Sequence, residues 1–126
     1  MTDKQLEQAK KQLREEMRAK GYGAFAGGYR KPPQEYHLRN RELWCIEMIN
    51  SILAYGCYGY TAEQVMQAEE QAYHNYLADY VKELGRERVV ALIQGQIDSM
   101  AYVRSGVFTD SEGLTYNSIV WKEETT

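Results

Sequence analysis

The sequence Leu43-Trp-Cys-Ile-Glu-Met-Ile-Asn-Ser-Ile-Leu53 decides the fold of this chain. Its apolar side chains cover more than half of the circumference of a helix that we expect to run from residue 34 or 40 to residue 55. A helix that is hydrophobic on nearly all sides belongs in the middle of a helical bundle. We therefore expect the remaining segments to pack around residues 43–53.

Helix start and stop signals predict three further helices, which cover residues 4–20, 62–84 and 86–102. Thr2 with Gln5 and Thr61 with Gln64 each match the capping box that begins a helix. Glycines at positions 21 and 85 then end the first and second of these helices.

The spacing of three tyrosines, Tyr73, Tyr76 and Tyr80, matches one face of the helix predicted at residues 62–84. Apolar residues such as Val65 and Leu77 share that face. We interpret the tyrosines as part of the core rather than as a stacking surface.

The end of the chain changes to the pattern of a β-hairpin at residues 106–121. Its turn, Asp110-Ser-Glu-Gly113, is typical of a type I turn followed by a glycine in the left-handed conformation. The predicted fold class is mainly α (α+β), an irregular four-helix bundle closed by this hairpin. We expect a single domain, 1–126, divided into a charged helix (1–20), a glycine-rich, aromatic and basic loop (21–33), a helical core (34–102) and the hairpin (106–121).

Charge is distributed unevenly along the chain. Residues 1–41 hold ten Lys and Arg against five Asp and Glu, whereas residues 42–126 hold five against thirteen, which together give the net charge of −3. A charge asymmetry of this kind steers oppositely charged surfaces together, so it indicates interaction with a partner.

The first functional hypothesis is a non-enzymatic protein-binding module. Its acidic, tyrosine-bearing surface would compete for the basic groove of a nucleic-acid-binding protein by electrostatic complementarity. Small acidic inhibitors from phages and other mobile elements work in this way, and anti-CRISPR proteins are one such group, although no family motif is recognised here. The residues expected at this contact are Tyr55, Tyr58, Tyr60, Glu69, Glu70, Asp79 and Glu83.

Two alternatives stay open. In the first, the basic segment 11–41 binds nucleic acid directly, with cations on phosphates and aromatic rings stacked on bases. Its contacts would be Lys11, Arg14, Arg18, Tyr22, Phe25, Tyr29, Arg30, Lys31, Arg39 and Arg41. In the second alternative, the protein is a self-associating structural protein whose basic segment docks on the acidic part of the same chain or of a neighbouring subunit.

Catalytic signatures are weak in this sequence. His37 and His74 are the only histidines, and neither they nor Cys45 and Cys57 show the spacing of a metal site. The glycines of residues 21–28 follow no predicted strand, so a dinucleotide fingerprint is not indicated. We therefore expect no enzyme, no cofactor and no metal, with a cytoplasmic location and no membrane segment.

Overall fold

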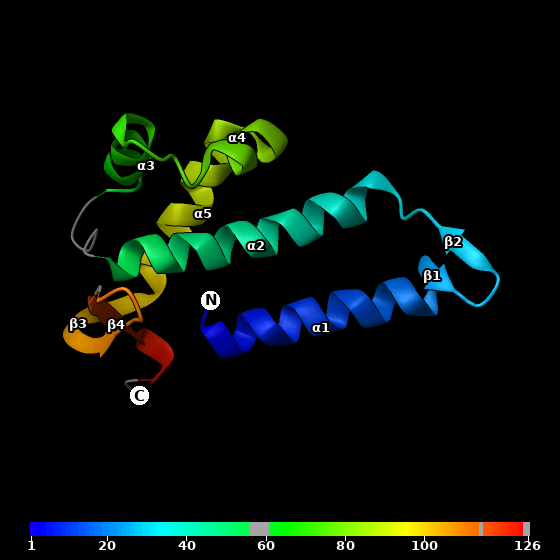
Figure 1. Cartoon of the computed structure of the whole chain (residues 1–126), viewed down its shortest axis with the longest axis horizontal. Coiled ribbons are helices and arrows are strands. Elements are labelled where there is room, and N and C mark those ends of the chain that lie inside the picture. Colours follow the sequence, from blue (N-terminus) through cyan, green and yellow to red (C-terminus); the bar gives the residue numbers. More distant parts are fainter. Residues whose placement is uncertain (56–60, 114, 125–126) are drawn as a thin grey trace.

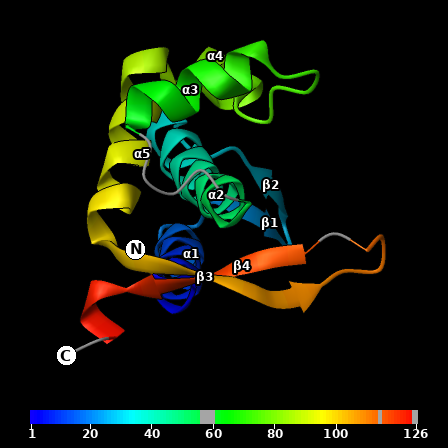
Figure 2. The same cartoon turned by 90° about the vertical axis from the view of Figure 1, so that its left-hand side faces the viewer.

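The computed structural model describes residues 1–55, 61–113 and 115–124. Two long helices, α1 (Asp3–Ala19) and α2 (Gln34–Ala54), lie side by side and run in opposite directions (Figure 1). The shorter helices α3 (Ala62–Gln71), α4 (Ala78–Leu84) and α5 (Arg86–Ser99) lie on the opposite side of α2 from α1 (Figure 2). A C-terminal antiparallel pair of strands completes the fold, so the predicted fold class is confirmed.

Helix α2 is the centre of the structure, as its sequence predicts. It contacts α1, α4, α5 and the last strand. Its fully buried residues Cys45, Ile49 and Leu53 join a core to which every other helix except α1 contributes. Helix α1 packs on α2 through a narrower stripe, in which Leu6 and Leu13 are buried.

Both predicted capping boxes are present. The Gln5 N–H donates to Thr2 Oγ1 over 3.1 Å, and the Thr2 N–H donates to Gln5 Oε1 over 2.9 Å. Thr61 and Gln64 repeat this exchange at the start of α3. These bonds satisfy backbone N–H groups that have no partner in the first turn of a helix.

The helix predicted at residues 62–84 is wrong in one respect, because it is interrupted between Gln71 and Ala78. Ala72 is extended, and the Leu77 N–H donates to the Asn75 side-chain oxygen over 3.0 Å. An Asn side chain that bonds nearby backbone competes with the helical hydrogen bond. The described residues thus hold five α-helices instead of four. Of the three tyrosines assigned to the core, Tyr80 is buried, whereas Tyr73 and Tyr76 are exposed.

The segment expected to be a loop, residues 21–33, contains a small antiparallel hairpin. Its strands are β1 (Gly23–Phe25) and β2 (Gly28–Arg30), and Ala24 pairs with Tyr29. Gly21 ends the preceding helix in a left-handed conformation with φ of 77°, as its position predicted. The hairpin joins α1 to α2 at one end of the long helix pair (Figure 1).

The C-terminal hairpin is longer than predicted. Strand β3 (Met100–Thr109) begins directly after α5, which ends at Ser99 rather than near residue 102, and β4 (Thr115–Trp121) pairs with it. Met100 and Trp121 face each other in the register and are both buried in the core, which explains why the strand starts there. Gly113 has the expected positive φ of 84° in the turn. A short 3-10 helix, η1 (Lys122–Glu124), follows.

Among the described helices, none has both the length and the apolar composition needed to cross a bilayer.

We predict that Ile49→Ala lowers the free energy of unfolding by about 2–5 kcal/mol, because the change leaves a cavity in the fully buried centre of α2. Urea denaturation followed by far-ultraviolet circular dichroism measures this loss. Ser51→Ala, on an exposed position of the same helix, is the matched control and should stay within about 0.5 kcal/mol of wild type. Equal stabilities for the two variants would contradict the central place of α2.

Candidate functional site

The connection between α3 and α4 presents an exposed aromatic surface, which we call the aromatic turn (residues 72–77). Tyr73 is 96% exposed and Tyr76 is 58% exposed. The His74 ring lies between them in sequence, with its centroid 4.7 Å from that of Tyr73 and 6.1 Å from that of Tyr76. Two large rings therefore face solvent in one short segment.

Hydrogen bonds hold the backbone of this turn. The Tyr76 N–H donates to Glu69 Oε2 over 3.2 Å, and the Ala78 N–H donates to the Asn75 carbonyl oxygen over 3.3 Å. Leu77, at the end of the turn, is fully buried in the core. The rings thus project from an anchored segment. Because the turn is already ordered, binding would lose less conformational entropy.

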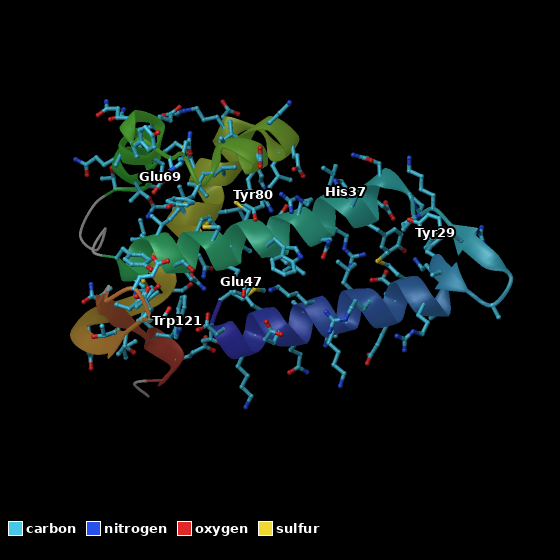
Figure 3. The ribbon with its side chains drawn as sticks, viewed as in Figure 1. Tyr29, His37, Glu47, Glu69, Tyr80 and Trp121 are labelled. Atoms are coloured by element: carbon cyan, nitrogen blue, oxygen red, sulfur yellow. The ribbon has the colours of Figure 1, made fainter. Side chains whose placement is uncertain are left out.

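The acidic residues predicted at a protein contact lie on the two helices that flank the aromatic turn. Glu69 and Glu70 are on α3, and Asp79 and Glu83 are on α4. Glu69 is half-buried on α3 (Figure 3). Two of these four carboxylates are already paired within the chain, because Glu70 accepts from Arg86 over 2.9 Å and Glu83 accepts from Arg41 over 2.7 Å.

Arg86 is held by two carboxylates, Glu63 and Glu70. Its hydrogen bonds hold the pKa of both carboxyl groups below their usual value. Glu63 and Glu70 are therefore ionised at neutral pH, and Arg86 cancels part of their charge. The remaining acidic character near the aromatic turn comes from Glu69 and Asp79, which make no ion pair within the described residues.

Of the three tyrosines predicted at this contact, the structure places only Tyr55. Tyr55 ends α2 and packs on Tyr116 of β4, with the ring centroids 4.5 Å apart. Tyr58 and Tyr60 lie outside the described residues. Tyr73 and Tyr76 are exposed next to the acidic helices. Their helical spacing had led us to predict that they belong to the core. Asn75 was the sequence signal for the break, because Asn favours the start of a helix over its interior.

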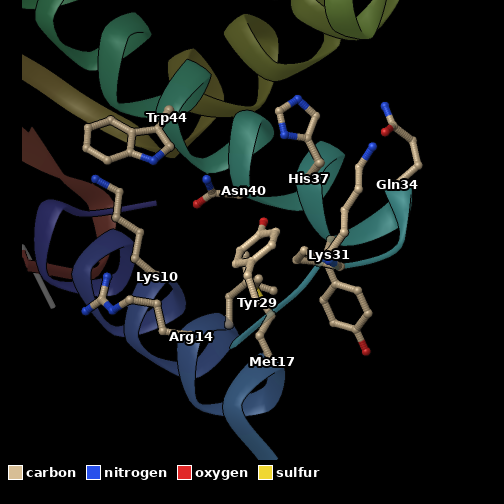
Figure 4. Close-up of a pocket in the computed structure, with 12 residues that line it drawn as sticks. Lys10, Arg14, Met17, Tyr29, Lys31, Gln34, His37, Asn40 and Trp44 are labelled. Atoms are coloured by element: carbon tan, nitrogen blue, oxygen red, sulfur yellow. The ribbon is translucent and has the colours of Figure 1, made fainter. Parts of the chain in front are cut away.

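A second candidate site is a cleft of about 620 Å³ between α1, the β1–β2 hairpin and the first half of α2, which we call the basic cleft. Figure 4 shows Lys10, Arg14 and Met17 along α1, and His37, Asn40 and Trp44 along α2, with Tyr29 between the two rows. None of its described lining residues is acidic; they are Lys10, Leu13, Arg14, Met17, Tyr29, Lys31, Pro32, Gln34, Tyr36, His37, Asn40 and Trp44.

Lys10 forms the most buried charged part of this cleft, with a side chain only 6% exposed. Its Nζ lies 2.6 Å from Glu47 Oε2 and 4.0 Å from the centroid of the Trp44 ring. The indole ring thus covers a paired ammonium group, an arrangement that cation–π attraction favours. Trp44, predicted among the apolar residues of the central helix, is 45% exposed here.

The residues predicted for a nucleic-acid contact divide between the basic cleft and other places. Arg14, Tyr29 and Lys31 line the cleft. Arg30 stacks over Tyr22, which itself packs on Tyr36, while Arg39 pairs with Glu16 over 2.9 Å and Arg41 with Glu83. Exposed positions on α1 outside the cleft hold Lys11 and Arg18. The Phe25 side chain lies outside the described part of the structure.

Sequence reasoning missed the cleft residues Lys10, His37, Asn40 and Trp44, because they come together only when α1 and α2 pack. Within residues 1–55, 61–113 and 115–124, no group of three metal-ligating side chains forms. Burial raises the pKa of the Cys45 thiol to about 12, so this thiol stays protonated at neutral pH.

Comparison with models of protein families, with curated proteins and with solved structures found no match.

We predict that Arg86→Gln destabilises the protein at neutral pH and that this difference disappears on acidification. Arg86 lowers the folded-state pKa of Glu63 and Glu70 from 4.5. The stabilisation is therefore complete above that value and is lost as the pH falls through the lowered values. Urea midpoints of wild type and variant, measured from neutral to acid pH, test this.

The control is Lys82→Gln, because Lys82 is an exposed cation of α4 without an ion pair in the described residues. A wild-type to Arg86→Gln difference that stayed constant between neutral and acid pH would contradict the assigned role of Arg86.

Proposed function

We propose that this chain is a non-enzymatic protein-binding module that docks its aromatic turn into a basic groove of a partner protein. The observation that supports the proposal is the exposure of Tyr73 and Tyr76 on a turn whose backbone is held by hydrogen bonds. Tyrosine is among the residues most enriched at binding hot spots, because it combines a large apolar ring with a polar tip.

Charge gives this surface a preferred partner. Glu69 and Asp79 flank the aromatic turn without an ion pair in the described residues, while Glu63 and Glu70 stay ionised beside Arg86. A basic groove on the partner would pair with Glu69 and Asp79 and would raise the rate of association. The partner that we propose is therefore a nucleic-acid-binding protein, whose nucleic-acid site this module occupies as an inhibitor of the kind found in mobile elements.

We predict that the double variant Tyr73→Ser/Tyr76→Ser loses the partner. Affinity capture from lysate treated with nuclease identifies the partner, and titration of the purified proteins then measures the affinity. Removing two hot-spot rings should weaken binding at least about thirtyfold. Tyr102→Ser, at an exposed tyrosine of β3, should bind as wild type does.

Partner recovery that is equal for wild type and the double variant would contradict the role of the aromatic turn. Sedimentation measurements separate the remaining alternative. If the wild type is a dimer and the double variant is a monomer, the partner of the aromatic turn is a second copy of this chain.

A further inference from the structure

The basic cleft offers unpaired positive charge to a ligand. Arg14 and Lys31 both line it, and neither makes an ion pair within the described residues. Lys10 differs, because Glu47 neutralises it beneath the Trp44 ring. The cleft thus has two free cations near its rim and no described carboxylate in its lining, so it favours an anionic group.

Two partly exposed aromatic rings also line the cleft, with Tyr29 between Arg14 and Lys31 (Figure 4). Tyr29 on β2 is 69% exposed, and Trp44 on α2 remains nearly half exposed. The backbone pairing of Tyr29 with Ala24 fixes its position in the hairpin. Exposed rings on two separate elements can stack against a flat aromatic group, and such stacking tolerates any base.

The size of the cleft and its polar groups narrow the ligand further. A volume of about 620 Å³ lies within the range of sites that bind small molecules. Asn40 lies between His37 and Trp44 along the α2 wall (Figure 4), where its amide can pair with the edge of a base. A ligand that joins a flat ring to a negatively charged group could stack on an aromatic ring, hydrogen-bond to the Asn40 amide and pair with a cation.

We propose that the basic cleft binds a nucleotide unit, with a phosphate at Arg14 or Lys31, which lie on opposite sides of Tyr29 (Figure 4), and with its base stacked against Tyr29. This site lies on α1, the β1–β2 hairpin and α2, apart from the aromatic turn, and it does not depend on the protein partner proposed above. Its ligand comes either from a free nucleotide or from a strand of single-stranded nucleic acid, because both present the same base and phosphate.

The test uses the full-length chain with two probes. Anisotropy of a fluorescein-labelled oligothymidylate reports binding of a strand, and calorimetry with adenosine 5′-monophosphate reports binding of a free nucleotide. We predict that Tyr29→Ala weakens binding roughly five- to 150-fold, the range for loss of one stacking ring. Arg14→Gln/Lys31→Gln should also lower the slope of log affinity against log salt for the strand by about 1.4, since each lost phosphate contact removes about 0.7.

Lys11→Gln/Arg18→Gln is the matched control, because it removes the same two charges from exposed positions of α1 outside the cleft. It should keep affinity near that of wild type for both probes. All of these substitutions are at exposed or cleft positions. Circular dichroism of each variant verifies that the helices are retained.

Each outcome decides the proposal. If both probes bind and the cleft variants weaken this binding, the ligand is a free nucleotide. If only the strand binds, the ligand is single-stranded nucleic acid. If neither probe binds at millimolar concentration, the proposal is overturned. Binding that the control pair weakens as much as Arg14→Gln/Lys31→Gln also overturns it. Neither result would alter the expected loss of a protein partner on changing Tyr73 and Tyr76.

Discussion

Burial of α2 on most of its circumference is the constraint on which the rest of the structure depends. Helices α4 and α5 contact it on one side, where α3 joins the same core, and α1 and the C-terminal hairpin lie on the other side (Figures 1 and 2). Helix α1 carries only a narrow apolar stripe, so its contact with α2 is centred on residues such as Leu6 and Leu13. Beside Leu13 and Met17 of that stripe, the two helices also carry polar and aromatic side chains, and the basic cleft lies there.

The uneven charge of the chain is partly resolved within the fold. Lys10 pairs with Glu47 and Arg41 pairs with Glu83, and both bonds join the basic first segment to the acidic remainder. Each such ion pair neutralises one cation and one carboxylate, so neither contributes a full charge to the surface that a partner contacts. Among the groups without an ion pair in the described residues, Arg14 and Lys31 lie at the cleft, whereas Glu69 and Asp79 flank the aromatic turn. Net charge alone therefore describes neither surface.

Local signals made much of the fold predictable. The capping boxes at Thr2 and Thr61 and the turn at Gly113 each depend on a few neighbouring residues, and each is present. The break at Asn75 was missed because tyrosines on both sides continue a helical spacing, so periodicity outweighed a single polar residue. The pairing of Ala24 with Tyr29 was missed because the strands are only three residues long. The cleft needs residues from α1 and α2 together, which no local pattern reveals.

The two tryptophans of the chain occupy opposite environments. Trp121 is 4% exposed at the base of the C-terminal hairpin, whereas Trp44 is accessible over an ammonium group. Their intrinsic fluorescence therefore separates into two signals without any added label. We expect iodide, an anion, to quench Trp44 selectively in the native protein, and emission from Trp121 to shift only when the core is opened to water. A single spectrum thus reports on the surface between α1 and α2 and on the integrity of the core at the same time.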